Sequence, residues 1–426
     1  MKIAMIHPSL WGRGGAERQL LRLAIELQKI GHEVEIFTDA VSEKCYPYLL
    51  RNLTVNVIPH PLWRFHRGLA WHATSSMIHQ EPLEKKDISY LQKLMKKLIL
   101  QQYYANELPL MLNLGRGIPK GFDIINNHNF PSEWAAFIAK KNLKVPIVWM
   151  CNEPPSWFLS TNSSKQKRRL SKLYWPLFEL FDKAAVNYID KIVVLSHVSA
   201  KDVRKAYNRS ACVVRSGVDV DFFHKASGES FRKAYGLENS FVLLQVGNIG
   251  RVRRNIDSVK ILNSLSRSYD NVKLIFDGYG SPEQINLLTT LVKKLGIKDK
   301  MLFLHTESDE ELAEVYAACD VFVYPSQITW SLAVTEAMAA AKPVIVPKQC
   351  GVSEIVQSGV NGIVVDHVRP EEIAKQVELL MNNPKLRKKL GENAYEYVKN
   401  NLSWEKYAKN MESVFEQTIS NFKRNF

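Results

Sequence analysis

A basic, glycine-containing turn has the residue types that suit chemistry on a phosphorylated ligand. It runs from Gly247 to Asn255 and includes Arg251, Arg253 and Arg254, after the apolar run FVLLQVG and before a helical pattern. Glycine lets a backbone approach a ligand closely, and arginines at the start of a helix suit a diphosphate. An ordinary surface turn has the same composition, so the turn by itself leaves both interpretations open.

A single carboxylate, Glu336, lies in the otherwise small and apolar stretch SQITWSLAVTEAMAAAKPVIVP at 326–347. A polar turn precedes it and a short apolar run of β type follows. Burying a carboxylate costs about several kcal/mol unless a partner compensates for it. Glu336 is therefore either solvated or held in place to grip a ligand.

His128 and a pair of aspartates are further candidate site residues. His128 ends the run DIINNH, which reads as a strand, and is predicted to point into a cleft; a lone histidine is also often a satisfied core group. Asp219 and Asp221 have the DxD spacing of metal ligands. Turn formation explains Asp219, and the aromatic residues after Asp221 fit a core, so no metal is expected there.

The glycine-rich turn at 12–18 loosely resembles a dinucleotide-binding loop. It does not read GxGxxG, and Trp11 is bulky for close packing on a pyrophosphate. Asp39 stands where a ribose-binding acid would be expected in such a domain. An NAD-dependent oxidoreductase therefore stays among the alternatives.

Two series of alternating strands and helices position these residues. The first series has the strand-like runs KIAMIH, HEVEIFTD, VNVIPH, FDIINNH, VPIVWMC and KIVVLSH, and the second has FVLLQVG, KLIFDGYG, MLFLH, DVFVYP, PVIVP and GIVVD. Such alternation predicts an α/β fold of two doubly wound, Rossmann-like domains that face each other across a cleft. Ligands bind at the carboxyl ends of the strands in such sheets.

The composition fits a globular protein of the cytoplasm. The chain has 426 residues, of which 46% are apolar and 23% are charged, and its five cysteines are scattered. That cysteine usage fits a reducing compartment and argues against a disulfide framework or a zinc site. The opening MKIAMIHPSLW reads as a first strand, because its apolar run is too short for a signal peptide.

The formal net charge of +14 requires an interpretation. The stretch 84–100 reads as an amphipathic basic helix, and 165–181 changes from basic to aromatic. Both stretches suit an exposed helix and loop, and both suit contact with an anionic membrane surface. A nucleic-acid binder would rest on charge alone, since no motif of that class is present.

Motifs spread along nearly the whole chain carry a resemblance to a known family. They are GGAER at 14–18, DIINNH at 123–128, DKIVVLS at 190–196, SGVDVDFF at 216–223, VGNIGRVRRN at 246–255, DGYG at 277–280, ESDEELAEVYAACDVFVYPS at 307–326, TEAMAAAKPVIV at 335–346 and CGVSEIVQSGVNGIVV at 350–365. In this order the motifs are highly specific. The chain resembles the family-4 retaining glycosyltransferases, which have the two-domain GT-B fold.

The resemblance implies a division of the chain into three parts. Residues 1–222 form an N-terminal, acceptor-side domain, and residues 223–402 form the domain that binds the nucleotide sugar. The stretch LSWEKYAKNMESVF at 402–415 resembles the last helices of the family. Residues 403–426 are therefore expected to pack back on the N-terminal domain.

The resemblance also implies roles for particular residues. Arg251 and Arg254 match the basic pair that binds the donor diphosphate. Arg253 is an alternative to Arg254, because the turn is one residue longer than usual. Glu336 matches the ligand of the nucleotide ribose, and His128 matches the histidine beside the donor sugar. The donor-binding residues implied in this way are Gly14, Gly15, Arg253, Asn255, Ile328, Trp330, Ser331, Leu332, Ala333 and Glu336.

The chain departs from the family pattern near the expected sugar pocket. The family usually has a glutamate eight positions before the ribose ligand, and here that position is Ile328, next to Gln327. Cys350 stands where a glycine is common. These changes leave the identity of the sugar open. They also support the alternative of a catalytically weak or inactive nucleotide-sugar-binding protein.

The resemblance implies a metal-independent, retaining transfer of a hexose-type sugar, without a cofactor. The implied acceptor is a glycan or a lipid-linked molecule at the cytoplasmic face of the membrane, which fits the basic stretches and the segment WMCNEPPSWF at 149–158. An epimerase would need further carboxylates in the cleft, and a phosphorylase would need a lysine for pyridoxal phosphate. Neither is evident.

Overall fold

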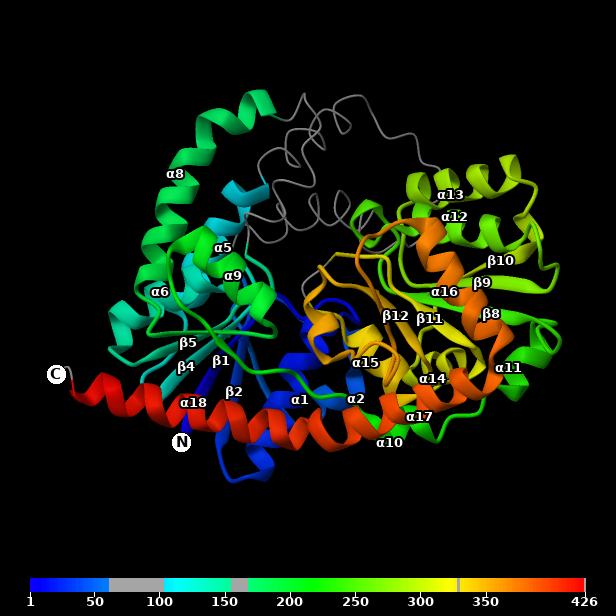
Figure 1. The fold of residues 1–426 in the computed structure, drawn as a ribbon. Helices are drawn as coiled ribbons and strands as arrows, with labels where there is room; N and C mark the ends of the chain where they lie inside the picture. The colour runs from blue at the N-terminus through cyan, green and yellow to red at the C-terminus, as the bar shows by residue number, and fades with distance from the viewer. Residues whose placement is uncertain (61–102, 155–167, 328–329, 425–426) are drawn as a thin grey trace. The chain divides into compact units, whose positions relative to one another are not determined.

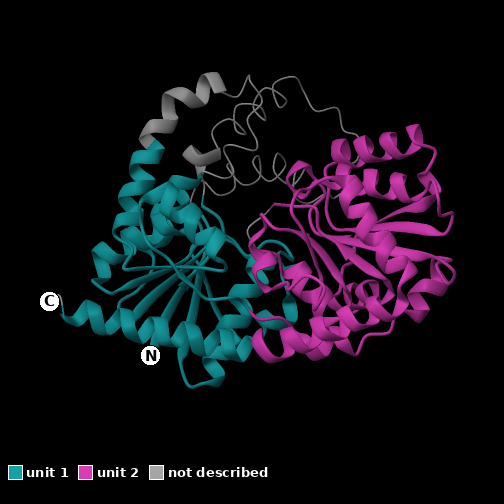
Figure 2. Ribbon diagram, in the orientation of Figure 1, with its two compact units in different colours: residues 1–76, 81–216, 404–426 teal, residues 77–80, 217–403 magenta. Residues whose placement is uncertain are grey.

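The structure is a computed structural model that describes residues 1–60, 103–154, 168–327 and 330–424. The chain forms two compact units (Figure 2). It passes from unit 1 to unit 2 after Ser216 and returns to unit 1 at Trp404. The sequence placed these two boundaries after residues 222 and 402. Each unit is built around its own parallel sheet.

Unit 1 contains a seven-stranded parallel sheet in the order β3-β2-β1-β4-β5-β6-β7. Its strands are β1 (Lys2–Ile6), β2 (Glu33–Thr38), β3 (Thr54–Val57), β4 (Ile124–His128), β5 (Ile147–Met150), β6 (Lys191–Val194) and β7 (Cys212–Val213). Its helices are α1 (Gly15–Lys29), α2 (Pro47–Leu50), α5 (Tyr103–Arg116), α6 (Ser132–Leu143), α8 (Arg168–Asn187), α9 (His197–Tyr207) and α18 (Trp404–Arg424).

Helices cover both faces of this sheet (Figure 1). One face packs on α5, α6, α8 and α9, around the fully buried side chains of Trp134 and Trp149. The other face packs on α1 and α18. A parallel sheet covered in this way buries both sides of its strands, which explains why β1 and β4 are buried almost throughout.

The C-terminal helix α18 belongs to unit 1, as the sequence predicts. One side of α18 is buried, and it packs on α1. Two side-chain contacts fix its position: Gln19 Nε2 donates to Tyr407 Oη at 3.0 Å, and His32 Nε2 lies 2.8 Å from Glu412 Oε1.

Unit 2 contains a six-stranded parallel sheet in the order β10-β9-β8-β11-β12-β13. Its strands are β8 (Phe241–Val246), β9 (Val272–Asp277), β10 (Met301–Leu304), β11 (Val321–Val323), β12 (Val344–Pro347) and β13 (Ile363–Val365). Its α-helices are α10 (Val220–His224), α11 (Glu229–Ala234), α12 (Asn255–Leu265), α13 (Pro282–Lys294), α14 (Asp309–Ala318), α15 (Leu332–Ala339), α16 (Pro370–Asn382) and α17 (Pro384–Asn401). Three 3₁₀ segments are η1 (Arg251–Arg253), η2 (Lys298–Lys300) and η3 (Gly351–Ile355).

Two groups of helices cover the sheet of unit 2 (Figure 1). Apolar side chains of α12, α13 and α16 form one core with the strands. On the other face Tyr316 of α14 lies against Phe322 of β11 and Phe223 of α10, with ring centroids 5.9 and 5.4 Å apart. The predicted α/β fold with two doubly wound domains is therefore confirmed.

The apolar runs identified in the sequence all contain strands of the two sheets. The amphipathic helix expected at 84–100 lies outside the described residues. Of the basic stretch at 165–181, the part from Arg168 onward opens α8. Across the described residues, every helix is too short or too polar to span a membrane.

Candidate active site

Two glycine loops run side by side at the carboxyl edge of the unit 2 sheet. Gly247 follows β8 with φ +125°, and Gly278 follows β9 with φ +146°, values that disfavour a side chain. A methyl group on Gly278 would overlap the carbonyl oxygen of Gly247. Gly247 N donates to Asp277 O at 2.8 Å. The backbone at this edge is thus fixed, and it has no side chain at Gly247 and Gly278.

The arginine turn that follows β8 is held by hydrogen bonds to its main chain. Gln245 Nε2 donates to Arg253 O at 2.8 Å, and Ser258 Oγ holds Gln245 Oε1 at 2.7 Å. Gly250 N donates to Asn255 Oδ1 at 2.8 Å, which places the predicted donor-binding residue Asn255 inside the turn. These bonds define where the arginine side chains begin.

The three arginines of the turn have different surroundings. Arg254 Nε forms an ion pair with Asp257 Oδ2 at 2.6 Å, and its φ of +55° is left-handed. Arg253 Nη1 instead donates to the phenol of Tyr324 at 2.6 Å. Arg251 is exposed, and within the described residues neither Arg251 nor Arg253 has a carboxylate partner. Among the described residues, two cationic side chains therefore have no carboxylate partner at this edge.

Helix α15 begins at the same edge, after β11. Ser331 stands at its N-cap but makes no capping bond with its side chain, and both Ser331 and Trp330 are buried. Leu332 and Ala333 of the first turn are half-buried. Uncapped N–H groups at a helix start favour an anion. Ile328 lies outside the described residues, so its effect on the sugar pocket stays a prediction.

Glu336 is buried one turn into α15, with 6% of its surface exposed. Tyr316 Oη donates to its Oε2 at 2.9 Å. A hydrogen bond of this kind offsets part of the cost of burial and fixes the direction of the carboxylate. Glu336 is therefore held in place, not solvated.

In unit 1 a second glycine-rich turn opens α1. Gly14 is the N-cap and Gly15 the first helical residue. Tyr46 Oη donates to Gly14 O at 3.2 Å, and the guanidinium of Arg13 lies over the Tyr46 ring, 5.0 Å from its centroid. Burial raises the pKa of Glu17, in the first turn, to about 7. The turn has a defined place at the carboxyl edge of the sheet.

A chain of polar side chains connects three strand ends of unit 1. Asn129, after β4, lies with its Nδ2 3.1 Å from Nε2 of His7, which follows β1. Asn152, after β5, donates to Asn129 Oδ1 at 2.6 Å and to Gln19 Oε1 at 2.9 Å. Gln19 in turn contacts Tyr407 of α18. The carboxyl edge of this sheet is therefore lined by amides and imidazole.

His128 ends β4 and is completely buried. Its Nε2 lies 2.8 Å from Asn126 Oδ1, whereas Nδ1 has no partner among the described residues. Asn126 Nδ2 donates to Val148 O at 3.0 Å, so Asn126 Oδ1 is the acceptor and His128 Nε2 carries the proton. Burial, together with nearby His7, holds the pKa of His128 well below its usual range. The imidazole is neutral and keeps Nδ1 as an acceptor.

The remaining sequence candidates lie elsewhere in the described structure. Asp219 is the N-cap of α10 and Asp221 lies in its first turn. Asp39 follows β2 and is buried. Cys350 precedes η3, and burial raises its pKa to about 12. Within the described chain, no three His, Cys, Asp or Glu residues gather where they would hold a metal.

Two tyrosines that contact the predicted site were missed by sequence reasoning. Tyr324 holds Arg253 and Tyr316 holds Glu336. Both lie in quoted motifs, in which they read as core residues. The only available signal was that each places a hydroxyl inside an otherwise apolar run, DVFVYP or AEVYAA.

Comparisons with known proteins bear on this architecture. Residues 13–222 match the model described as Glycosyltransferase Family 4, and residues 227–397 match Glycosyl transferases group 1. The D-inositol 3-phosphate glycosyltransferase of Mycolicibacterium smegmatis is 25% identical over 85% of this chain and 77% of its own length. An uncharacterized glycosyltransferase of Methanocaldococcus jannaschii is 26% identical over 87% of this chain and 96% of its own.

The fold is also that of solved structures. HepE of Anabaena, in complex with UDP-glucose, superposes with a TM-score of 0.72 and 17% identity, over 98% of this chain and 100% of that one. The two parallel sheets, the returning helix α18 and the two matched family models agree. The chain belongs to glycosyltransferase family 4 and has the GT-B fold.

Proposed function

We propose that the protein transfers a hexose-type sugar from a nucleotide-diphosphate sugar to an acceptor, with retention of anomeric configuration and without a metal. One observation carries the proposal. The carboxyl edge of the unit 2 sheet presents Arg251 and Arg253 without a carboxylate partner among the described residues, at the same edge as the uncapped start of α15. Such an arrangement suits a diphosphate.

The geometry supports Arg253 over Arg254 as the second diphosphate ligand. The charge of Arg254 is already offset by Asp257, and its Nη2 points to Val368 O at 3.4 Å. Arg253 is held by a neutral phenol, which fixes the guanidinium and leaves its charge in place. We therefore assign the diphosphate to Arg251, Arg253 and the first amides of α15, and give Arg254 a structural role in the turn.

Glu336 is assigned to the ribose hydroxyls of the donor. Its burial and its fixed orientation by Tyr316 support a carboxylate that accepts hydrogen bonds in a constant direction. In unit 1 we assign Gly14 and Gly15 to the approach of the donor, and His128 to a hydroxyl of the sugar. Because the imidazole is neutral and Nδ1 is an acceptor, His128 suits a hydrogen bond from a sugar hydroxyl. It does not suit the role of an acid that donates a proton.

The proposed reaction breaks the bond between the sugar C1 and the β-phosphate oxygen and forms a bond from C1 to an acceptor hydroxyl oxygen. The acceptor proton passes to the leaving diphosphate on the same face of the sugar. The negative charge that develops on the diphosphate is stabilised by Arg251, Arg253 and the helix amides. These groups take over the neutralisation of charge that a metal provides in other transferases.

We propose a glycan or lipid-linked acceptor and an enzyme that contacts the inner face of the membrane. The net charge of +14 and the basic opening of α8 support an anionic surface as partner. The relative from Mycolicibacterium smegmatis is named for a phosphorylated acceptor, D-inositol 3-phosphate, which keeps a phosphorylated small molecule as the competing choice. Flotation with vesicles that contain anionic lipid tests the membrane proposal, and absence of wild-type binding would contradict it.

A thermal-shift screen with nucleotide sugars tests the function itself. A donor at 100 times its Kd stabilises a protein by about 2.7 kcal/mol. We expect one base and one sugar to stand out and then to support release of nucleotide diphosphate when membrane extract supplies an acceptor. Donor binding without any transfer would favour the inactive nucleotide-sugar-binding alternative, and no binding would reject both.

A further inference from the structure

Tyr324 directly follows β11, in the middle of the unit 2 sheet. Its side chain is fully buried, with 0% of its surface exposed. A phenolic hydroxyl in such surroundings needs hydrogen-bond partners, because burying it without one is costly. The identity of those partners shows what the tyrosine does.

The hydroxyl of Tyr324 lies among groups of the proposed diphosphate site. Arg253 Nη1 donates to it at 2.6 Å. Burial raises the pKa of Tyr324, whereas the positive charge of Arg253 acts in the opposite direction. Ser326 Oγ also donates to Val252 O at 3.1 Å, inside the arginine turn. The buried hydroxyl of Tyr324 thus contacts the arginine turn.

Ser331 behaves unlike the equivalent serines of the same unit. Ser281 and Ser308 cap α13 and α14, each with a complete capping box. Ser331 holds the same N-cap position in α15, yet its side chain makes no capping bond. The first N–H groups of α15 therefore stay available to an anion.

Arg253 gains a defined position from its contact with Tyr324. Gln245 Nε2 donates to the main-chain oxygen of Arg253. The guanidinium of Arg253 makes one hydrogen bond to the described residues, which is the bond to Tyr324. A long side chain that is fixed before the ligand arrives loses less freedom on binding. Because the partner is neutral, the positive charge of Arg253 is kept for the ligand.

We propose that Tyr324 is a positioning residue of the transfer reaction, which acts by holding the guanidinium of Arg253 in place for the donor diphosphate. The inference deepens the proposed function and rests on it. A role in folding alone would lower the affinity for monophosphates and diphosphates equally. The proposed role lowers only the affinity for ligands that carry the second phosphate.

Titration calorimetry with UDP, GDP and ADP and with their monophosphates provides the test. For the diphosphate that binds wild type best, we expect Tyr324→Phe to weaken binding by about fivefold, the size of one modest hydrogen bond. Affinity for the matching monophosphate should change by less than about twofold. Tyr269→Phe is the matched control, since it removes a hydroxyl bond of the same unit to Glu378, and we expect no change in either affinity.

A double-mutant cycle with Arg253→Ala isolates the connection. If Tyr324 acts through Arg253, adding Tyr324→Phe to Arg253→Ala should change the diphosphate affinity by less than about twofold. Should Tyr324→Phe fail to fold, Arg253→Lys keeps the charge but loses the planar guanidinium that Tyr324 holds, and it should lower the diphosphate affinity in the same selective way.

Three results would overturn the inference. Equal losses of monophosphate and diphosphate affinity would show a general loosening of the unit, and fully additive effects with Arg253→Ala would show independence from that arginine. An unchanged diphosphate affinity would also reject it. If wild type binds none of the three diphosphates, the proposed function falls first and the inference falls with it, an outcome that the wild-type titration alone identifies.

Discussion

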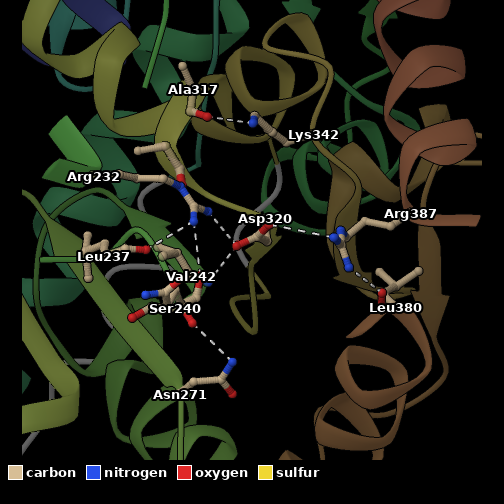
Figure 3. A network of polar contacts seen from close by, with 12 residues as sticks. Arg232, Leu237, Ser240, Val242, Asn271, Ala317, Asp320, Lys342, Leu380 and Arg387 are labelled. Atoms are coloured by element: carbon tan, nitrogen blue, oxygen red, sulfur yellow. Dashed lines mark hydrogen bonds and ion pairs between the residues drawn. The ribbon is translucent and has the colours of Figure 1, made fainter. Parts of the chain in front are cut away.

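Arginine side chains have different partners at the two edges of the unit 2 sheet. At the amino edge Asp320, just before β11, accepts from Arg232 Nη2 at 2.6 Å and from Val242 N at 2.8 Å (Figure 3). Arg232 also donates to the carbonyl oxygens of Ala318, Leu237 and Ser240. Every polar group in this cluster is used by the fold itself.

At the carboxyl edge Arg251 and Arg253 have no carboxylate partner among the described residues. Arg253 has a phenol where Arg232 has a carboxylate, and Arg251 is exposed. We base the proposal on this contrast: an arginine with a carboxylate partner is assigned to the fold, and one without is assigned to the ligand. On that basis Arg254, which pairs with Asp257, belongs with the structural group.

Unit 1 shows the same division between its edges. Asp123 and Asp190 lie just before β4 and β6 and accept from Lys2 N and Ile147 N, each at 2.7 Å. At the carboxyl edge His7, Asn129 and Asn152 contact one another through their side chains. Aspartates thus accept main-chain hydrogen bonds at the amino edges of both sheets.

The largest effect is expected from a substitution at the amino edge. Asp320→Ala removes a side chain that is only 19% exposed and leaves the Arg232 guanidinium without its anion. We expect the free energy of unfolding in urea to fall by about 3 kcal/mol, since a charged group loses its partner. Nucleotide affinity of the folded protein should stay the same. Asp366→Ala, which breaks an exposed pair with Lys348, is the control and should cost less than about 0.5 kcal/mol.

A substitution at the carboxyl edge should affect the ligand more than the fold. Glu336→Ala removes the proposed ribose ligand, so donor affinity should fall by roughly 10- to 100-fold, which is about 1.5–3 kcal/mol. Calorimetry with the best donor measures it. Tyr316→Phe keeps the carboxylate but removes its orienting bond and should show a smaller loss in the same direction. Unchanged donor affinity and rate in Glu336→Ala would remove Glu336 from the site.

The smallest effect concerns pH and the carboxyl edge of unit 1. Glu17 has a pKa raised to about 7 in the fold, above its ordinary 4.5. Because the folded state holds this proton more tightly, its stabilising contribution is complete below pH 4.5 and is lost as the pH rises toward 7. Glu17→Gln should therefore flatten the pH dependence of the melting temperature in that interval. The same slope in both proteins would contradict the assignment.

Much of the architecture was predictable because local patterns carry it. Apolar runs identify buried parallel strands, and the loops that follow them place Gly247 and Glu336 at the carboxyl edge. The returning helix α18 was also predictable from the family motif at its start. Because each follows an identifiable strand in the sequence, Gly247 and Glu336 can be placed near the carboxyl edge of the sheet.

The different partners of Arg253 and Arg254 were not predictable from the sequence. They depend on the left-handed backbone of Arg254, which turns that side chain toward Asp257, and on Tyr324, which is 71 residues away from Arg253. Likewise the complete burial of His128 follows from the packing of its surroundings and not from its place at the end of a strand. Long-range contacts of single side chains leave no periodic signal.

The difference between compensated and uncompensated arginines is tested most directly by one calorimetric comparison. Wild type, Arg253→Ala and Arg254→Gly are titrated with the best of UDP, GDP and ADP; glycine at 254 tolerates the left-handed backbone. We predict a loss of roughly 10- to 100-fold for Arg253→Ala, because a charged hydrogen bond to the diphosphate disappears, and less than about threefold for Arg254→Gly. Equal losses, or a larger loss for Arg254→Gly, would contradict the account.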